Sequence, residues 1–385
     1  MEKEKLESLL RGKNINFLIG AGASLPTYPT LRLDNTDQSF EDIVSSSQLN
    51  SYAKRIMYIY YYLKWLYPMT DIEEWNNNDI VNKNYVTFIK KLYDYLQTES
   101  NESPKRINIF TTNYDFMFEK SFDYIVKDYP LIFFNDGSRG FIKRYIGNEN
   151  YYLNVSHSGY NDNYKREIPT INLAKIHGSL SWIYDEDSQK IMVDFTRQRF
   201  DDLYKLCIEI LSNITLMEDD EDIENEFYKE IENCFNGENT IENLNNRFNS
   251  DYQLDEFEKQ YNELMIINPN KYKFNKTVSE QHYYQLIRSF SYELEKNQAV
   301  LIVFGFSFAD EHIRSIFERS LSNPELLVII ICYDGNSQRQ MQQMFGKYKN
   351  VMFLPEEDKI SNSNDDGKTN GDFKYLLDLL GDLNE

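Results

Sequence analysis

The sequence predicts an α/β protein built on a Rossmann-like parallel sheet, with helices on both faces and inserted helical lobes. Short apolar runs typical of buried strands alternate along the chain with longer segments of helical pattern. Several of these runs end directly in a glycine or polar cluster, as the strands of doubly wound sheets do. The chain has 385 residues, more than one hydrophobic core usually serves, so we expect insertions around the sheet.

The predicted strands and helices follow one another in the order that a parallel sheet requires. A short helix precedes the first strand, and a further strand is expected just before Lys175. The other expected strands are 15–19, 107–110, 131–134, 264–267, 300–304, 326–332 and 351–354. The expected helices are 52–66, 85–96, 116–126, 280–295, one capped by Asp310 and a last one after Gly371. The polar segment 141–169 is expected to form loops or hairpins.

We expect one domain whose core is interrupted by two helical insertions. The core segments are 1–48, 103–184 and 262–385, and the insertions are 49–102 and 185–261. The second insertion contains the acidic run 218–222, which suits solvent or a basic partner and has no use in a core. We therefore expect this lobe to serve assembly or gating, with the chemistry elsewhere.

Composition excludes several classes of function. The formal net charge of −21 would repel a phosphate backbone, so direct nucleic-acid binding is not expected. Cys207, Cys234 and Cys332 are too scattered for a disulfide framework or a zinc site, so no metal is expected. The amino terminus lacks the apolar core of a signal peptide, and no apolar stretch is long enough to span a bilayer. These features predict a cytoplasmic protein without membrane contact.

Three polar clusters follow apolar strands, at the edge where open parallel sheets bind ligands. The segment 20–22 (Gly-Ala-Gly) lets the backbone approach a pyrophosphate, although an ordinary glycine turn explains the same residues. Asn113 and Asp115 offer groups for ribose hydroxyls, water or a carboxamide, although both are also common helix caps. His177 can act as a general base, although a single histidine is more often structural. Together the clusters favour a dinucleotide site.

In order, the segments GAGAS, TTNYD, KIHGS and GFSFAD resemble the catalytic domain of sirtuins. More closely, they are similar to the zinc-free sirtuin-like NAD hydrolases of bacterial anti-phage defence, over residues 15 to about 380 apart from the helical insertions. Thr112 stands where deacylating sirtuins commonly have Gln, and the paired CxxC motifs of their zinc module are missing. The resemblance therefore implies the NAD half of a sirtuin site without the usual groove for acyl-lysine.

The resemblance implies a role for each matching residue. Asn113 would hold the ribose and the attacking water, and His177 would contact the ribose hydroxyls as base or organiser. Asp115 would orient the nicotinamide carboxamide. The positions that would bind NAD are Gly20, Ala21, Gly22, Ser24, Arg32, Thr112, Asp115, Gly305, Ser307, Asp334 and Phe373. Among these, Arg32 would lie near the phosphates, whereas Gly305, Ser307, Asp334 and Phe373 would serve the adenosine side.

The implied activity is hydrolysis of NAD to nicotinamide and ADP-ribose, which depletes NAD in anti-phage abortive infection. Catalysis would consist of orienting NAD and one water around an oxocarbenium-like transition state. One alternative is a deacylase or ADP-ribosyltransferase, which would need a peptide groove. The other is a non-catalytic sensor of NAD or ADP-ribose, which would bind without turnover. Because constant loss of NAD is toxic, we expect control by assembly, through a homo-oligomer or a HerA-type hexameric ATPase partner.

Overall fold

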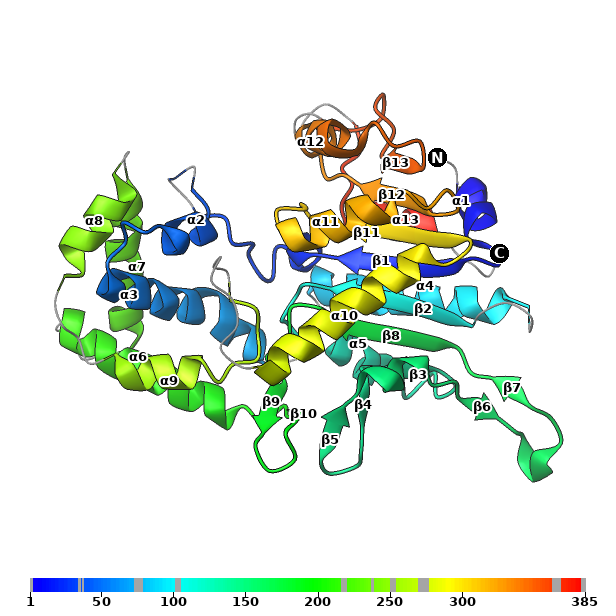
Figure 1. Cartoon of the computed structure of the whole chain (residues 1–385), viewed down its shortest axis with the longest axis horizontal. Helices are drawn as coiled ribbons and strands as arrows, with labels where there is room; N and C mark the ends of the chain where they lie inside the picture. Colours follow the sequence, from blue (N-terminus) through cyan, green and yellow to red (C-terminus); the bar gives the residue numbers. More distant parts are fainter. Residues whose placement is uncertain are drawn as a thin grey trace. The chain divides into compact units, whose positions relative to one another are not determined.

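Seven parallel strands form the central sheet of the computed structural model, in the order β13-β12-β11-β1-β2-β8-β3 (Figure 1). This confirms the predicted α/β fold with a parallel sheet. The strands are β1 (Asn14–Ile19), β2 (Arg106–Thr111), β3 (Phe133–Asn135), β8 (Thr170–Lys175), β11 (Ala299–Phe304), β12 (Leu327–Ile331) and β13 (Val351–Leu354). The structure describes residues 3–33, 36, 38–72, 79–100, 105–215, 220–236, 239–249, 254–268, 277–361 and 368–381.

The chain forms two compact units, each of which contains several segments. The first comprises Met1–Thr27, Trp75–His177 and Gln281–Glu385, and the second comprises Tyr28–Glu74 and Gly178–Glu280. The central sheet belongs to the first unit. Its helices are α1 (Lys3–Leu10), α4 (Ile80–Thr98), α5 (Met117–Ile125), α10 (Thr277–Glu295), α11 (Glu311–Ser320), α12 (Gly335–Phe345) and α13 (Phe373–Leu380). Helix α4 lies in the expected insertion 49–102 yet packs on α5 and α13 of this unit.

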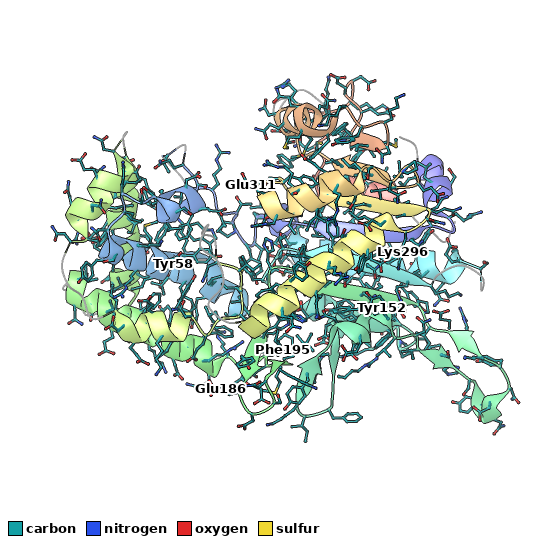
Figure 2. All side chains as sticks on the ribbon, viewed as in Figure 1. Tyr58, Tyr152, Glu186, Phe195, Lys296 and Glu311 are labelled. Carbon is teal, nitrogen blue, oxygen red and sulfur yellow. The ribbon has the colours of Figure 1, made fainter. Side chains whose placement is uncertain are left out.

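Helices cover both faces of the sheet. The Phe17 ring of β1 packs edge-on against Phe88 of α4 at 5.1 Å, and the Phe110 ring of β2 packs against Phe290 of α10 at 5.0 Å. Phe110 pairs in register with Leu18, the neighbour of Phe17, so the two rings point to opposite faces. Helix α10 therefore covers one face, which it crosses in Figure 1, and α4 covers the other. Side chains fill the layers between them (Figure 2).

A ladder of four buried asparagines crosses the sheet on the face that Phe110 shares. Asn16, Asn108, Asn172 and Asn135 are register partners on β1, β2, β8 and β3. The Nδ2 of Asn108, Asn172 and Asn135 each donates to the Oδ1 of the preceding asparagine, at 2.8, 2.8 and 2.9 Å. At the ends, Asn16 donates to the Asn14 carbonyl at 3.1 Å and Asn135 accepts from the Gly137 amide at 3.2 Å. Every amide oxygen and nitrogen of the ladder is thus paired.

The second unit is helical and rich in aromatic residues. Its elements are α2 (Phe40–Ser45), α3 (Ser51–Tyr61), a π turn (Tyr62–Leu66), a 3-10 turn (Tyr67–Thr70), β9 (Trp182–Asp185), β10 (Lys190–Val193), α6 (Gln198–Thr215), α7 (Asp220–Phe235), α8 (Thr240–Arg247) and α9 (Asp255–Tyr261). Trp65 packs edge-on against Phe40 at 5.8 Å and against Tyr60 at 5.4 Å. Of the acidic run 218–222, residues 218 and 219 lie outside the described residues.

The structure corrects three details of the predicted element order. Residues 264–267 are not a strand of the sheet, because only Ile266 pairs, in an isolated antiparallel bridge with Gly178. The hairpin of β9 and β10 was not expected in the acidic insertion, and α12 was not expected either. The segment 141–169 takes part in short antiparallel pairs, in line with the expected hairpins. Its β5 (Arg144–Ile146) pairs with β4 (Ser138–Arg139), which precedes the segment, and its β6 (Ser156–His157) pairs with β7 (Arg166–Glu167).

Candidate functional site

The carboxyl ends of four adjacent strands lie level with one another. Phe304 of β11, Ile19 of β1, Thr111 of β2 and Lys175 of β8 form one row of register partners across the sheet. From β1 the chain continues to β2 on one side, whereas β11 lies on the other side. Open α/β sheets bind ligands at such a reversal of strand order. The four loops that carry the predicted clusters therefore leave the sheet at a single level, beside this reversal.

Glycines bring the loops after β1 and β11 into backbone contact. The N–H of Gly20 donates to the Phe304 carbonyl, and the N–H of Gly22 donates to the Gly305 carbonyl, both at 3.0 Å. A Cβ on Gly20 would lie 2.4 Å from the Gly305 oxygen, and one on Gly305, whose φ is +64°, would lie 2.5 Å from Ala23 N. Only glycine fits this contact. After Gly20 the chain forms a single 3-10 turn, Ala21–Ser24.

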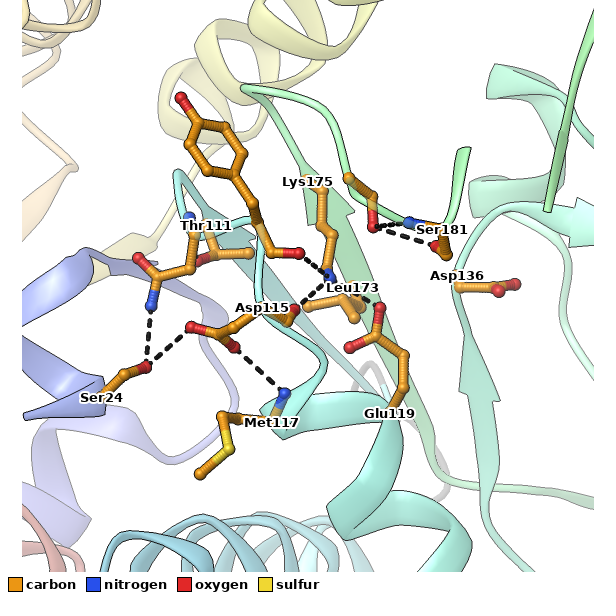
Figure 3. A network of polar contacts seen from close by, with 12 residues as sticks. Ser24, Thr111, Asp115, Met117, Glu119, Asp136, Leu173, Lys175 and Ser181 are labelled. Atoms are coloured by element: carbon orange, nitrogen blue, oxygen red, sulfur yellow. Dashed lines mark hydrogen bonds and ion pairs between the residues drawn. The ribbon is translucent and has the colours of Figure 1, made fainter. Parts of the chain in front are cut away.

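Ser24 is the centre of a buried hydrogen-bond network (Figure 3). Its hydroxyl donates to Asp115 Oδ2 at 2.9 Å, lies 2.9 Å from the Tyr85 hydroxyl and accepts from Asn113 Nδ2 at 3.3 Å. Because a hydroxyl has one proton and a carboxylate only accepts, the Ser24 proton goes to Asp115 and Tyr85 donates to Ser24. The Ser24 hydroxyl is therefore fully engaged within the protein, although the resemblance implied that Ser24 would bind NAD.

This network determines the orientation of the Asn113 amide. Ser24 has no second proton, so only the Nδ2 end of Asn113 makes a hydrogen bond with it. The Oδ1 end consequently points away from Ser24. Asn113 is 6% exposed, and among the described residues no group donates to its Oδ1. The cluster thus contains a buried, oriented acceptor whose own partner is missing.

Asp115 has a structural role at the start of a helix, the alternative to ligand binding that the sequence also allowed. Its Oδ1 accepts from the N–H of Met117, the first residue of α5, at 3.1 Å, although the N-cap position itself is Phe116 (Figure 3). Its Oδ2 holds Ser24. The capping interpretation is therefore borne out in part for Asp115. It does not apply to Asn113, whose Nδ2 contacts the Ser24 hydroxyl.

A buried ion pair supports the loop behind Asn113. The Lys175 ammonium lies 2.7 Å from Glu119 Oε1 and donates to the Asp115 carbonyl (Figure 3). It also lies 5.3 Å from the centre of the Phe116 ring. Burial raises the pKa of Glu119, against the opposing effect of the Lys175 charge. The last residue of β8 thus fastens the loop that follows β2.

His177 faces a carboxylate from another loop. Its Nε2 lies 3.2 Å from Asp310 Oδ2, and both side chains are largely buried, at 13% and 14% exposed. The Oδ1 of Asp310 accepts from the N–H groups of His312 and Ile313 at 2.8 and 3.1 Å. The predicted cap of α11 is therefore confirmed, and the same carboxylate also contacts the candidate base.

The loop that carries Asp310 has an unusual backbone. Phe308 is buried with a φ of +57°, a left-handed conformation that bulky residues rarely adopt. Its ring packs on Phe317 at 4.7 Å and on Phe345 at 4.9 Å. Strained backbone of this kind persists where the surrounding packing determines it. The aromatic packing therefore holds the loop between β11 and α11 in one conformation.

The other residues expected to bind NAD lie in several places. Ala21 and Ser307 are exposed in the loops after β1 and β11, and the Thr112 N–H donates to the Ile19 carbonyl at 3.2 Å. Asp334 follows β12 and caps α12, where its side chain accepts from the Ser337 N–H at 2.8 Å. These loops all follow strands of the central sheet.

Phe373 and Arg32 belong to different units of the chain. Phe373 is buried in the core, with its ring 5.2 Å from Tyr85, 5.9 Å from Phe88 and 5.1 Å from Phe304. It thus supports the tyrosine that bonds to Ser24. Arg32 belongs to the second unit, where it is exposed and forms an isolated bridge with Ser39.

Sequence reasoning missed the residues that position the others. Tyr85 was assigned only to a helix, Asp310 only to a cap, and Lys175 and Glu119 received no role. Lys175 directly follows an apolar run and so offered a signal, because a lysine there is buried only with a partner. The pairing of Asp310 with His177 had no signal in the sequence.

Comparison with known proteins does not assign this chain to a family. Neither the family models nor the curated proteins contain a match for the chain. Within the described residues, no three His, Cys, Asp or Glu side chains group as metal ligands would, and no helix has the length and apolar character needed to cross a membrane. The resemblance to sirtuin-like domains therefore rests on the residues of this chain alone.

Proposed function

We propose that this chain is an NAD hydrolase that cleaves the bond between nicotinamide and ribose. The observation that carries the proposal is the buried Asn113 Oδ1, an acceptor without a partner among the described residues. It lies where four loops leave the sheet beside the reversal of strand order. A ribose hydroxyl or a water would complete it and recover the roughly 1–3 kcal/mol that an unpaired buried polar group costs.

The proposed chemistry divides between Asn113 and His177. Asn113 lies two residues after Thr111, and His177 two residues after its register partner Lys175, so both start from equivalent points on neighbouring strands. Asn113 would hold the ribose or the attacking water through Oδ1. His177 would take the proton that the water or a ribose hydroxyl gives up. The glycosidic C–N bond breaks, its electron pair stays with nicotinamide, and water oxygen forms the new C–O bond.

The resemblance to defence hydrolases supports a biological role for this reaction. We propose that the enzyme drains NAD from an infected cell as a form of anti-phage defence. The engaged amide of Gly22 and the engaged hydroxyl of Ser24 leave the pyrophosphate contacts to other groups of these loops. The exposed Ala21 and Ser307 are the nearest candidates in sequence.

The direct test follows nicotinamide release from NAD by chromatography and NAD binding by calorimetry. The purified chain is assayed alone and with the product of its neighbouring gene. We expect turnover by the wild type, and for His177→Ala a loss of about 10²–10⁴-fold with NAD binding largely retained. His157→Ala, a matched substitution on β6, should behave as wild type.

Two outcomes contradict the proposal. A wild-type chain that neither binds NAD at millimolar concentration nor releases nicotinamide is not an NAD enzyme. Binding without any turnover, with or without the neighbouring product, would instead indicate the sensor function.

A further inference from the structure

We propose that Asp310 is a positioning residue that fixes the tautomer and ring orientation of His177. The Asp310 Oδ2 lies 3.2 Å from His177 Nε2, and both side chains are largely buried. A carboxylate only accepts, so the ring nitrogen that faces it carries the proton. The catalytic part of this inference rests on the proposed function, whereas the tautomer itself does not.

The two oxygens of Asp310 have separate tasks. Oδ1 accepts from the His312 and Ile313 N–H groups at the start of α11, and this contact holds the carboxylate at the end of a ten-residue helix. A helix N-terminus favours a negative charge, which suits a carboxylate at this position. Oδ2 faces the imidazole of His177. The cap thus fixes the position of the carboxylate relative to His177.

The loop before Asp310 keeps this geometry rigid. Phe308 is held in its left-handed backbone conformation by packing on Phe317 and Phe345. This packing stabilises the strained backbone conformation close to the Asp310 carboxylate. The backbone of Asp310, two residues further on, is therefore held in a defined position.

The chemical consequence is the choice of the reacting nitrogen. With the proton on Nε2, the lone pair of His177 lies on Nδ1. Nδ1 is then the atom that accepts a proton from a ribose hydroxyl or from the attacking water. The imidazolium that forms donates to Asp310 through Nε2, and the nearby carboxylate stabilises its positive charge.

The test compares Asp310→Asn and Asp310→Glu with wild type by two measurements. The first is the ¹⁵N spectrum of the histidine ring nitrogens, with the His177 signals assigned from their loss in His177→Gln. The second is NAD turnover, with kcat and KM determined separately. Asn is as good a helix cap as Asp, so the fold should be retained in Asp310→Asn.

We expect the Nε2–H tautomer in wild type and a shift toward Nδ1–H in Asp310→Asn, because the new amide can donate to Nε2. The kcat for NAD should fall by about 10²–10⁴-fold with little change in KM. Asp310→Glu should recover part of the kcat, since it restores a carboxylate.

Asp79→Asn is the matched control. Asp79 caps α4 in the same manner, with Oδ1 accepting from the Val81 and Asn82 N–H groups, while its Oδ2 accepts from the Thr27 hydroxyl. It should leave both measurements unchanged.

The results separate this inference from the proposed function. An unchanged His177 tautomer in Asp310→Asn would overturn the positioning role, even if wild type hydrolyses NAD. A changed tautomer in a chain that never cleaves NAD would retain the positioning role and reject the hydrolase. Unchanged kcat in Asp310→Asn, in a chain that does hydrolyse NAD, would show that the contact is not used in catalysis.

Discussion

Two buried polar clusters of the first unit, the asparagine ladder in mid-sheet and the cluster around Asn113 at the strand ends, differ in how completely their hydrogen bonds are made. Both involve β1 and β2 or the loops that follow them. In the ladder, each Oδ1 accepts and each Nδ2 donates, from Asn16 to Asn135. In the other cluster, the Nδ2 of Asn113 is bonded and its Oδ1 has no partner among the described residues.

The difference shows that buried amides in the middle of this sheet are fully hydrogen-bonded. An unpaired buried acceptor costs roughly 1–3 kcal/mol, enough to be removed readily by substitution. Its presence at the edge where open α/β sheets bind ligands is therefore best explained by a group that completes it when bound. If this explanation holds, substitutions in the cluster around Asn113 should reduce activity, whereas substitutions in the asparagine ladder should reduce stability.

The largest effect should come from Asn113→Ala, and on activity alone. NAD cleavage should fall by about 10²–10⁴-fold, because the group that holds the ribose or water is lost. The free energy of unfolding should change by less than about 1 kcal/mol, since the variant also removes an unpaired buried oxygen. Rates of nicotinamide release and urea unfolding measure the two quantities. Full activity combined with a large loss of stability would assign Asn113 to structure and reverse the comparison.

Asn108→Ala should show the opposite pattern. Removing this central rung leaves Asn16 Oδ1 without its partner and leaves Asn172 Nδ2 with only its bond to the Tyr151 carbonyl at 3.0 Å. We expect the free energy of unfolding to fall by about 2–5 kcal/mol, from one unpaired buried oxygen and one unpaired buried N–H. Turnover per folded molecule should be close to wild type.

The control for this variant is Asn163→Ala, whose exposed side chain bonds only to the Tyr160 carbonyl. It should leave the free energy of unfolding within about 0.5 kcal/mol of wild type. If Asn108→Ala is equally mild, the ladder does not stabilise the sheet.

His282 offers a smaller, pH-dependent test at a buried side chain whose charged form is disfavoured by burial. Burial lowers its pKa from 6.5 to about 4, and Asn148 Nδ2 lies 3.4 Å from its Nδ1. Because the folded pKa is below the unfolded value, its contribution to stability is present above pH 6.5 and is lost as the pH falls through about 4. The shift corresponds to about 3 kcal/mol.

The measurement is urea unfolding of wild type and His282→Gln between pH 7 and pH 4. The difference between the two free energies should shift in favour of the variant by up to about 3 kcal/mol as the pH falls, because Gln does not titrate. A difference that is constant with pH would show that His282 keeps its ordinary protonation in the folded state.

Much of the fold could be predicted because its central strands are apolar runs buried on both faces. Residues 264–267 misled the prediction, since an apolar run that packs outside the sheet looks the same in sequence. Helix α12 was missed because its sequence, GNSQRQMQQMF, is mostly polar and its only large apolar residues are Met341, Met344 and Phe345. The β9–β10 hairpin lay in a segment judged by its acidic character alone.

The candidate site was partly predictable for a related reason. Parallel strands end at one edge, so clusters that follow apolar runs must meet there, as the row from Phe304 to Lys175 does. The contacts between loops could not be predicted, because they depend on distant segments. Tyr85 is 61 residues from the Ser24 that it bonds, and nothing in the sequence pairs Asp310 with His177.

The asparagine ladder also restricts how the strands can find one another during folding. Apolar residues are interchangeable partners, so strands made of them alone could pair one or two residues out of alignment at little cost. A one-residue slip of β2 against β1 would set Asn16 opposite Ile107 or Ile109 instead of Asn108. Each such misalignment would leave asparagine amides without hydrogen-bond partners among hydrocarbon side chains. The four asparagines therefore favour one register of these strands, because only the native register pairs all of their amides at once.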